Sequence, residues 1–337
     1  MVIQEQRSLQ YDHTFGIHVN TNYFVELAHE EDAVPLLASL TKDHRPLMIM
    51  GDGSNILFTG NFPGTVIRVN TKGIIIKEDD ADSITIRVSA GEVWDDVVAY
   101  CVGKGWGGIE NLSLIPGRTG AGPIQNIGAY GVELKEVFGE LEAVHIETGE
   151  KKVFSREECW FGYRNSVFQT TLRGQYLILN VTLRLSRNPV PNIGYGSIGK
   201  ELEKSGITSP TISDVREVVC RIRRNKLPDP GVIGNAGSFF KNPVIRSDQF
   251  EGLKIQYPEI VSYPDSNGVK LAAAWLIQQC DWKGKRIGDA GVHQEQPLVL
   301  VNYGNATGQE IQNLAMMIRQ SVVSRFGILL EPEVNIL

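Results

Sequence analysis

A glycine-dense segment from residue 107 to residue 131 constrains the fold of this chain more than any other feature of the sequence. Seven of its 25 residues are glycine, where an average usage of about 7% predicts roughly two. Glycine permits positive φ angles and close backbone approach, and successive N–H groups in such loops can bind a diphosphate. The segment therefore fits a cofactor cradle. Turns between short strands would explain the glycines equally well, although Ser113, Gln125, Asn126 and Tyr130 add hydrogen-bonding groups that plain turns do not need.

Neither glycine loop of the chain matches a known nucleotide fingerprint. In Gly51-Asp52-Gly53-Ser54-Asn55, Ile56 occupies the position of the third glycine, and no amphipathic helix follows. The run 115–131 has neither the P-loop spacing nor the Rossmann spacing. We therefore expect a cofactor fold of another kind.

Composition limits the class of protein. A length of 337 residues predicts two or three domains, and 42% hydrophobic with 21% charged residues is ordinary for a soluble globular chain. The apolar runs are far shorter than the ~18 residues of a membrane span, and residues 1–10 lack a secretory signal, so we expect a cytoplasmic protein. A net charge of −6 gives no general attraction to nucleic acid.

The cysteines predict neither a metal site nor a disulfide framework. They are widely spaced, form no C-x-x-C pair and have no histidine at metal-ligand spacing. We interpret them as reduced structural thiols, at Cys101, Cys159, Cys220 and Cys280.

Hydrophobic periodicity predicts alternating strands and helices. An apolar run, a turn and a second apolar run predict strand, loop and strand over 47–58. Helices are expected around 94–102, from a cap at Thr211 or Ser213 to just before Leu227, and over 269–280 and 309–326. Pro189 and Pro191 indicate a domain boundary near 186–192. Further strands are expected at 65–70, 73–77, 83–90, 141–147 and 176–186. The chain is therefore predicted to be α+β.

Short motifs distributed in order over nearly the whole chain resemble those of one enzyme family. They are GDGSNIL at 51–57, IPGRTGAGPIQNIGAYG at 115–131, YRNSVF at 163–168, KLPDP at 226–230, GNAGSFFKNP at 234–243 and LEPEV at 330–334. Together they resemble the UDP-N-acetylenolpyruvoylglucosamine reductase family. Any one motif alone is weak, but their joint occurrence is specific.

The resemblance implies a fold and a domain order. It implies a vanillyl-alcohol-oxidase (PCMH)-type, two-lobed FAD-binding region followed by an α+β substrate-binding domain. The expected segments are FAD-binding lobes at 1–70 and 71–188, a substrate-loop connection at 189–210, a substrate-binding domain at 211–325 and a segment returning to the active site at 326–337. A monomer is also implied, with no membrane or nucleic-acid partner.

The resemblance also implies the reaction: NADPH reduces bound FAD, which reduces the enolpyruvyl ether of a UDP-amino sugar. It assigns proton donation to Ser238 and stabilisation of enolate charge to Arg164 and Glu333. Each residue also has a simpler interpretation, namely a turn serine, a surface ion pair and a solvated carboxylate near a chain terminus. Ser238 lacks the G-x-S-x-G context of a hydrolase nucleophile.

Motif matching further assigns cofactor and substrate contacts. The cofactor-binding positions are Gly51, Gly53, Ser54, Asn55, Ile115, Pro116, Gly117, Gly120, Ala121, Gln125, Asn126, Gly128, Ala129, Tyr130 and Gly131. The substrate-binding positions are Tyr195, Lys226, Asn242, Tyr263 and Gln296. Tyr195 resembles the tyrosine of the longer family subtype; taken alone it is a turn residue.

The chain departs from the family pattern at Asp52, Gly122 and Asn335, where glycine, alanine and arginine are usual, and it ends at Leu337. Asp52 beside a diphosphate is electrostatically unfavourable unless it points away, and the short tail could loosen the Glu333 segment. Two alternatives remain, an FAD oxidase or dehydrogenase of another alcohol or amino sugar, and a nonenzymatic flavin- or nucleotide-binding module. Ser238, Arg164 and Glu333 together favour the reductase.

Overall fold

The computed structural model describes residues 2–337, and the described chain packs into two compact units. Unit 1 contains the chain up to Arg7, Thr21–Asp52 and Pro63–Arg223; unit 2 contains Ser8–Asn20, Gly53–Phe62 and Arg224–Leu337. Residues 189–223 therefore pack with unit 1, and no boundary of the compact units lies near 186–192. The functional division into FAD lobes, connection and substrate domain stays a prediction.

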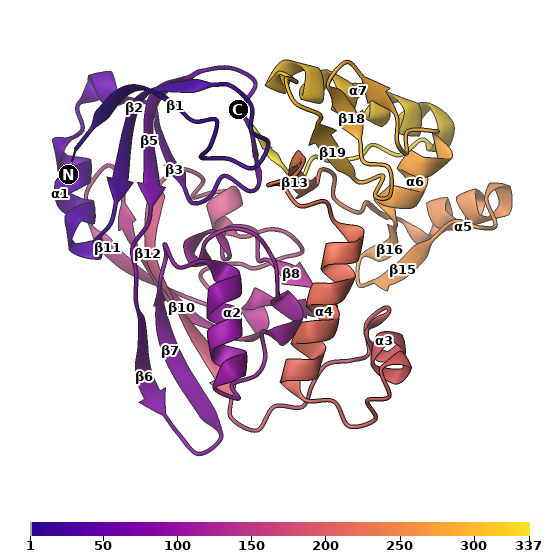
Figure 1. Ribbon diagram of the computed structural model, residues 1–337, viewed down its shortest axis with the longest axis horizontal. Coiled ribbons are helices and arrows are strands. Elements are labelled where there is room, and N and C mark those ends of the chain that lie inside the picture. Colours follow the sequence, from indigo (N-terminus) through magenta and orange to yellow (C-terminus); the bar gives the residue numbers. More distant parts are fainter. Residues whose placement is uncertain (1) are drawn as a thin grey trace. The chain divides into compact units, whose positions relative to one another are not determined.

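Unit 1 contains a four-stranded and a five-stranded sheet. One has the strand order β1-β2-β5-β3 and the other has the order β11-β10-β12-β7-β6; Figure 1 shows β6 and β7 as a long hairpin. The first set is β1 Gln4–Ser8, β2 Asn20–Leu27, β3 Leu47–Met50 and β5 Phe62–Val69; the second is β6 Ile74–Asp79, β7 Ser83–Ser89, β10 Phe138–His145, β11 Lys151–Ser155 and β12 Tyr176–Ser186.

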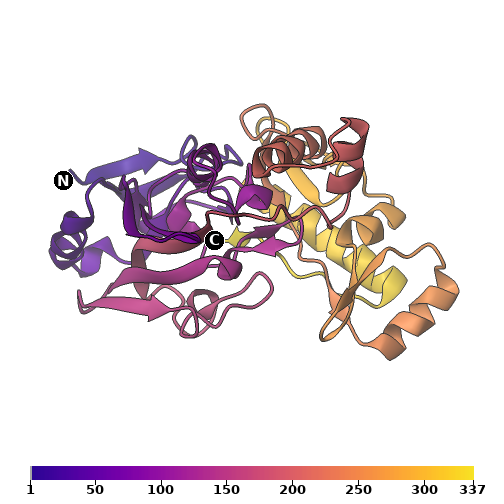
Figure 2. The same cartoon turned by 90° about the horizontal axis from the view of Figure 1, so that it is seen from below.

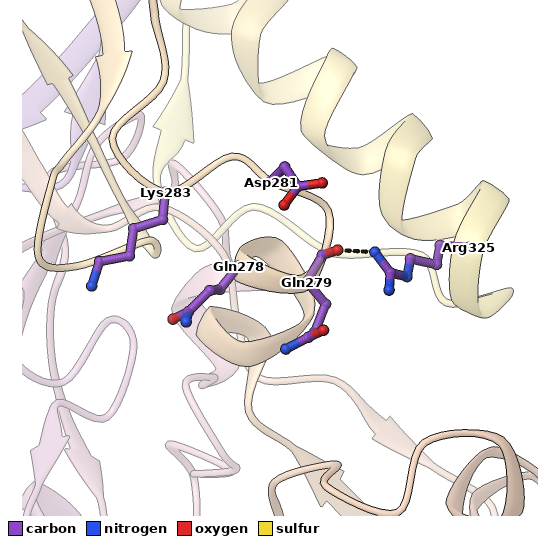
Figure 3. Close-up of a pocket in the computed structure, with 5 residues that line it drawn as sticks. All are labelled: Gln278, Gln279, Asp281, Lys283 and Arg325. Carbon is purple, nitrogen blue, oxygen red and sulfur yellow. Dashed lines mark hydrogen bonds between the residues drawn. The ribbon is translucent and has the colours of Figure 1, made fainter.

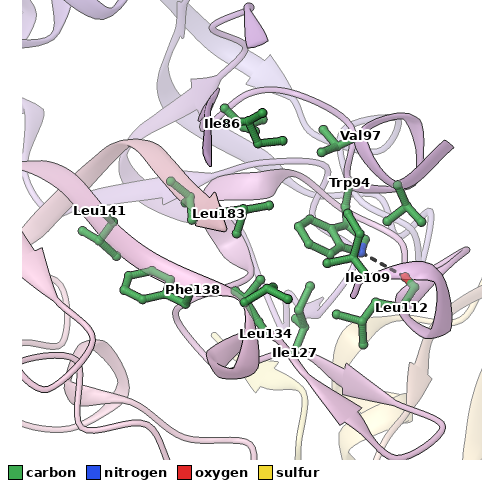
Figure 4. Close-up of a cluster of buried hydrophobic side chains, with 14 of the residues drawn as sticks. Ile86, Trp94, Val97, Ile109, Leu112, Ile127, Leu134, Phe138, Leu141 and Leu183 are labelled. Atoms are coloured by element: carbon green, nitrogen blue, oxygen red, sulfur yellow. Dashed lines mark hydrogen bonds between the residues drawn. The ribbon is translucent and has the colours of Figure 1, made fainter. Parts of the chain in front are cut away.

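The main core of unit 1 lies between the second sheet and helix α2, Trp94–Gly103. Ile84, Ile86 and Val88 of β7 are fully buried, as their shared face predicts. Trp94 is also buried, and its indole Nε1 donates to the carbonyl of Leu112 at 2.9 Å (Figure 4). This core holds the beginning of the glycine-dense segment against α2.

Two smaller clusters complete unit 1. Helix α1, Ala33–Ser39, packs with buried residues of β2, β5, β10 and β12. Helix α3, Ile198–Lys204, packs on α4, Ile212–Lys226, and Tyr130 joins that cluster. Thr211 caps α4, because its Oγ1 accepts the Asp214 N–H at 3.2 Å.

Unit 2 is built around a sheet with the strand order β13-β19-β18-β17, covered by α7, and α6 packs against α7. Helix α7 contacts β18 and β19, as Figures 1 and 2 show. A smaller sheet, β14-β16-β15, adjoins α5. The bounds are β13 Gly234–Ser238, β14 Val244–Ile245, α5 Ser247–Gln256, β15 Ser262–Asp265, β16 Gly268–Leu271, α6 Ala273–Gln279, β17 Arg286–Ile287, β18 Ala290–Val292, β19 Val299–Asn302 and α7 Gly308–Phe326.

Most sequence-based elements are confirmed, with one clear error. The strands of 47–57, 83–89 and 176–186 and the helices of 94–103, 212–226 and 308–326 form as predicted. The helix expected over 269–280 was wrong in its first third, because Gly268–Leu271 forms β16 and pairs with β14 and β15. Helix α6 begins only at Ala273. Tertiary strand pairing outweighed the local helical pattern there.

Candidate functional site

The glycine-dense loop lies across the end of β7 and the start of α2 in unit 1. The N–H of Gly120 donates to the Ala90 carbonyl, and that of Thr119 donates to the Glu92 carbonyl, both at 2.9 Å. From the other side, the Trp94 N–H donates to the Gly117 carbonyl at 3.0 Å. The loop is therefore fixed to the scaffold by its backbone.

Two glycines of this loop are required by geometry. Gly117 has a φ of +112°, a conformation that L side chains rarely adopt. A Cβ added at Gly120 would lie 2.6 Å from the Cβ of Ala90. Gly120 is buried, so its missing side chain allows the loop to pack closely on Ala90. A glycine-rich loop fixed in this way presents little side-chain bulk to a diphosphate, so the residues present fit an FAD cradle. Ile115 and Ala129 pack partly against the core of unit 1.

Asn126 stabilises the cradle from within. Its side chain is fully buried and donates to the carbonyl of Gly162 at 3.0 Å and to Glu133 at 3.1 Å, while its Oδ1 accepts the Lys135 N–H at 3.0 Å. Both amide N–H groups are thereby used. Asn126 thus shapes the loop, and its predicted cofactor contact would have to come from its backbone.

The Asp52 carboxylate is paired within unit 1. Its Oδ1 accepts from Arg118 Nε at 2.6 Å and lies 3.8 Å from Arg68 Nη2. Gly51 permits this pairing, since a Cβ there would lie 2.8 Å from Arg118 Cγ. The negative charge that the sequence places in the first glycine loop is therefore compensated, which removes the electrostatic objection to a diphosphate nearby.

Arg164 lies beside the cradle. Its Nη2 donates to the Gly128 carbonyl, and a Cβ at Gly128 would lie 2.8 Å from its Nη1. Arg164 itself has a φ of +50°, an uncommon conformation for a residue with a side chain. The absence of a side chain at Gly128 thus leaves room for the guanidinium of Arg164. The structure therefore brings a predicted catalytic residue next to predicted cofactor-binding residues.

Tyr195 packs on the same loop. Its ring meets that of Tyr130 edge-on, with centroids 6.3 Å apart, and its side chain covers Gly131, where a Cβ would lie 3.1 Å from the Cβ of Tyr195. Burial raises the pKa of Tyr130, although the neighbouring Arg223 partly opposes this. Burial lowers the pKa of Arg223, and the like charge of Arg164 lowers it further. Unit 1 therefore gathers aromatic and cationic groups around residues 128–131.

Ser238 and Glu333 come together in unit 2. Ser238 ends β13, after Gly237 with a φ of +69°, and it pairs with Val299 of β19. The next residue, Phe239, accepts the Glu333 N–H at its carbonyl at 2.8 Å. The two predicted catalytic segments of this unit therefore run side by side.

The Glu333 segment is also held to the second half of the GDGSN loop. Asn55 Nδ2 donates to the Glu333 carbonyl at 3.2 Å, and the Asn335 N–H donates to the Asn55 carbonyl at 3.0 Å. The next residues form β20, Asn335–Ile336, which pairs with β4, Ile56–Leu57. The expected loosening of this segment is not found, because a strand ladder holds it.

The other predicted substrate-binding residues are spread over unit 2. Lys226 is the last residue of α4, and Gln296 lies in the turn before β19. Asn242 Oδ1 accepts the Ala273 N–H at 3.0 Å, at the beginning of α6, and Tyr263 of β15 is about half exposed. Their role as substrate contacts stays a prediction, as does that of Arg164, Ser238 and Glu333.

The sequence interpretation missed several residues that organise the site. Arg118 lies inside the IPG motif but was not singled out, and Asp95 and Asn111 carry no motif signal. Asp95 forms a bidentate pair with Arg216 at 2.7 and 3.0 Å and accepts the Leu114 N–H at 2.6 Å. The only available signal was the presence of a polar residue in an otherwise apolar pattern, which does not indicate its partner.

A separate concavity of about 590 Å³ lies in unit 2, at the ends of α6 and α7 (Figure 3). It is lined by Gln278, Gln279, Asp281, Lys283 and Arg325, and Arg325 is occupied by a hydrogen bond to the Gln279 carbonyl. None of these five is a predicted site residue. Among residues 2–337, no group of acidic, histidine and cysteine side chains could hold a metal, and no helix is long and apolar enough to span a membrane.

No disulfide joins the cysteines of residues 2–337. Burial raises the pKa values of Cys101 and Cys159 to about 12. Thiols with such values are inert as nucleophiles at neutral pH.

Comparisons with known proteins agree with this geometry. Residues 229–337 match the family model of the UDP-N-acetylenolpyruvoylglucosamine reductase C-terminal domain, and residues 21–154 match that of an FAD binding domain. The chain is similar to UDP-N-acetylenolpyruvoylglucosamine reductases of Pseudomonas aeruginosa, 47% identical over 99% of this chain and 98% of that protein, and of Amoebophilus asiaticus, 47% identical over 100% of both.

The fold has a solved counterpart. The crystal structure of the reductase from Thermus caldophilus superposes with a TM-score of 0.70 at 23% identity and covers 99% of each chain. The predicted α+β fold with an FAD-binding region is thereby confirmed. The chain belongs to the UDP-N-acetylenolpyruvoylglucosamine reductase family and is an FAD-dependent oxidoreductase.

Proposed function

We propose that this enzyme reduces UDP-N-acetylglucosamine enolpyruvate to UDP-N-acetylmuramate with NADPH as the hydride source, in cytoplasmic peptidoglycan precursor synthesis. The family membership supports the substrate class. The single observation that carries the mechanism is the hydrogen bond from the Glu333 N–H to the Phe239 carbonyl at 2.8 Å. This bond holds the backbone of Glu333 to that of Phe239, the residue after Ser238, and so supports our proposal that Ser238 and Glu333 act at one site.

Bound FAD would supply hydride transfer, from NADPH to the terminal carbon of the enolpyruvyl group. The electron pair of the double bond then moves to the adjacent carbon and its carboxylate. Ser238 donates its Oγ proton to that carbon, and the serine regains a proton from solvent. One π bond is lost, two C–H bonds form and NADPH becomes NADP⁺.

The developing charge on the carboxylate needs donors. Arg164 offers five N–H groups in a planar fork, which matches a carboxylate better than lysine does. Its hydrogen bond to the Gly128 carbonyl fixes the fork beside the cradle. Glu333 can donate only in its protonated form, so we propose that the carboxylic acid of Glu333 is the active species.

The proposed function is tested by anaerobic stopped-flow absorbance of the purified holoenzyme. NADPH should bleach the flavin, and UDP-N-acetylglucosamine enolpyruvate should restore its absorbance within the turnover time. Bleaching without reoxidation by this compound would instead support reduction of another substrate. An NADH comparison in the same instrument decides the coenzyme preference.

A further inference from the structure

Asn111 connects two segments of unit 1 that the proposed mechanism needs in fixed positions. It lies in the 3₁₀ turn Glu110–Leu112, just before residues 115–131, which we call the cofactor loop. Only 1% of the Asn111 surface is exposed. Its Nδ2 donates to the Tyr130 carbonyl at 3.0 Å and to the Asn192 carbonyl at 2.9 Å. One buried amide thereby joins backbone sites 62 residues apart, the difference between 192 and 130.

Both hydrogen bonds act on the surroundings of Tyr195. Asn192 begins the stretch that leads to Tyr195, and Tyr130 belongs to the turn on which Tyr195 packs. We call residues 190–197 the Tyr195 loop. One accepting carbonyl therefore belongs to this loop, and the other belongs to the turn on which the Tyr195 side chain packs. Tyr130 has a φ of +50°, a strained conformation that persists only where the surroundings hold it.

The chemistry of the residue fits this task. Two carbonyls must receive N–H donors from one buried point, which a primary amide provides without burying a charge. The Asn111 Oδ1 has no hydrogen-bond partner among the described residues. The side chain is therefore used for its two donors alone, and an apolar or acidic residue of similar size would leave both carbonyls unsatisfied.

We propose that Asn111 is a positioning residue that ties the Tyr195 loop to the cofactor loop, so that loss of its two donors releases Tyr195 and weakens binding of the UDP-sugar. This rests on the proposed role of Tyr195 as a substrate contact. The part of the FAD cradle at residues 117–120 should keep its position in such variants, because the bonds of Gly117, Thr119 and Gly120 to residues 90–94 do not involve Asn111.

The test compares the holoenzyme with Asn111→Ala and Asn111→Asp. Asp has the same size but presents oxygens to both carbonyls, so it should be at least as impaired as Ala. Asn180→Ala is the matched control, since Asn180 is also buried and donates twice through Nδ2, to Glu30 and Glu142 rather than to the carbonyls of Tyr130 and Asn192. Asn111→Ser, which keeps one donor, serves if the alanine variant does not fold.

Two readouts are used. Hydrogen exchange of the peptide covering 190–197 should accelerate about tenfold or more in the Asn111 variants, the effect of roughly 1.4 kcal/mol on local opening, and should stay unchanged in Asn180→Ala. The KM for the UDP-sugar should rise by a similar factor, with the rate of flavin bleaching by NADPH within about twofold of wild type.

The outcomes separate the two proposals. Unchanged exchange of 190–197 in the folded Asn111 variants overturns the positioning role, whatever the activity. Faster exchange of 190–197 with an unchanged KM for the UDP-sugar would mean that Asn111 holds the loop but does not affect substrate binding. This result also overturns the proposal. Failure of the wild type to reduce the UDP-sugar defeats the proposed function instead, and the exchange measurement still decides whether Asn111 tethers the loop.

Discussion

Arg118 Nε donates to Asp52 Oδ1 at 2.6 Å and so compensates the negative charge in the first glycine loop. Both side chains are mostly buried, at 11% and 27% exposure, so the pair is only weakly screened by solvent. Arg118 additionally donates to the Gly91 carbonyl at 2.7 Å. The pair is therefore part of the frame on which the predicted FAD contacts depend.

Loss of Arg118 alone should weaken FAD binding more than loss of both charges. Arg118→Ala leaves Asp52 with only the more distant Arg68 beside the expected diphosphate, and we expect the FAD dissociation constant to rise about tenfold or more. Asp52→Asn in the same background should recover part of that loss. Equilibrium ultrafiltration with flavin fluorescence measures both, and an Arg118→Ala defect that Asp52→Asn does not change would exclude the electrostatic explanation.

Ser238→Ala should separate the two half-reactions. The protein should stay yellow and be bleached by NADPH at a near-normal rate, because only protonation of the substrate carbon loses its donor. Reoxidation by the UDP-sugar should slow by roughly 10²–10⁴-fold, the usual contribution of a general acid. Ser324→Ala, on the exposed side of α7, is the control. Equal slowing of both half-reactions would remove Ser238 from the proposed role.

Gly128→Ala should impair chemistry through Arg164. The new Cβ would lie 2.8 Å from Arg164 Nη1 and 3.0 Å from the Val132 carbonyl, so the guanidinium must move. We expect kcat to fall at least about tenfold with little loss of bound FAD, since a displacement of about 1 Å is enough for such an effect.

Gly252→Ala is the control for this substitution. Gly252 lies within α5, and no atom lies within 4 Å of its added Cβ. It should stabilise the fold by roughly 0.5–1 kcal/mol, as alanine does in an open helix position, and leave kcat unchanged. A normal kcat in Gly128→Ala would mean that the position of Arg164 does not limit the reaction.

The Asp95–Arg216 pair predicts a pH-dependent stability. Burial alone would raise the pKa of Asp95, but hydrogen bonds from Arg216 and the Leu114 N–H outweigh it, so the pKa lies below its ordinary value of 3.8. A carboxyl with a depressed folded-state pKa contributes stability above the unfolded value and loses it as pH falls through the folded value.

Asp95→Asn should therefore be less stable than wild type at pH 7. The difference should begin to narrow below about pH 4, where Asp95 of the unfolded wild-type chain becomes protonated, and it should narrow further as the pH falls through the lower folded-state pKa. Urea unfolding of both proteins at a series of pH values measures this. A gap that stays constant down to pH 3 would show that the charge of Asp95 contributes nothing beyond its hydrogen bonds.

The sequence by itself determined the family, the cofactor class and most elements. Motifs such as GAYG and LEPEV are contiguous, and the alternation of Ile84, Ile86 and Val88 or the cap of α4 depends on neighbours only a few residues away. Such local patterns are readable because their physical cause, side-chain periodicity and turn chemistry, is itself local.

Only the tertiary structure decided what depends on distant partners. Residues 268–271 became a strand because β14 and β15 were there to pair with them, and Asp52 is paired because Arg118 reaches it across 66 positions of sequence. The same is true of Arg164 at Gly128 and of Asn111 between residues 130 and 192. A hydrogen bond between distant residues produces no periodic pattern in the sequence of either segment. Its two partners can therefore be identified only once the packed core has brought the segments together.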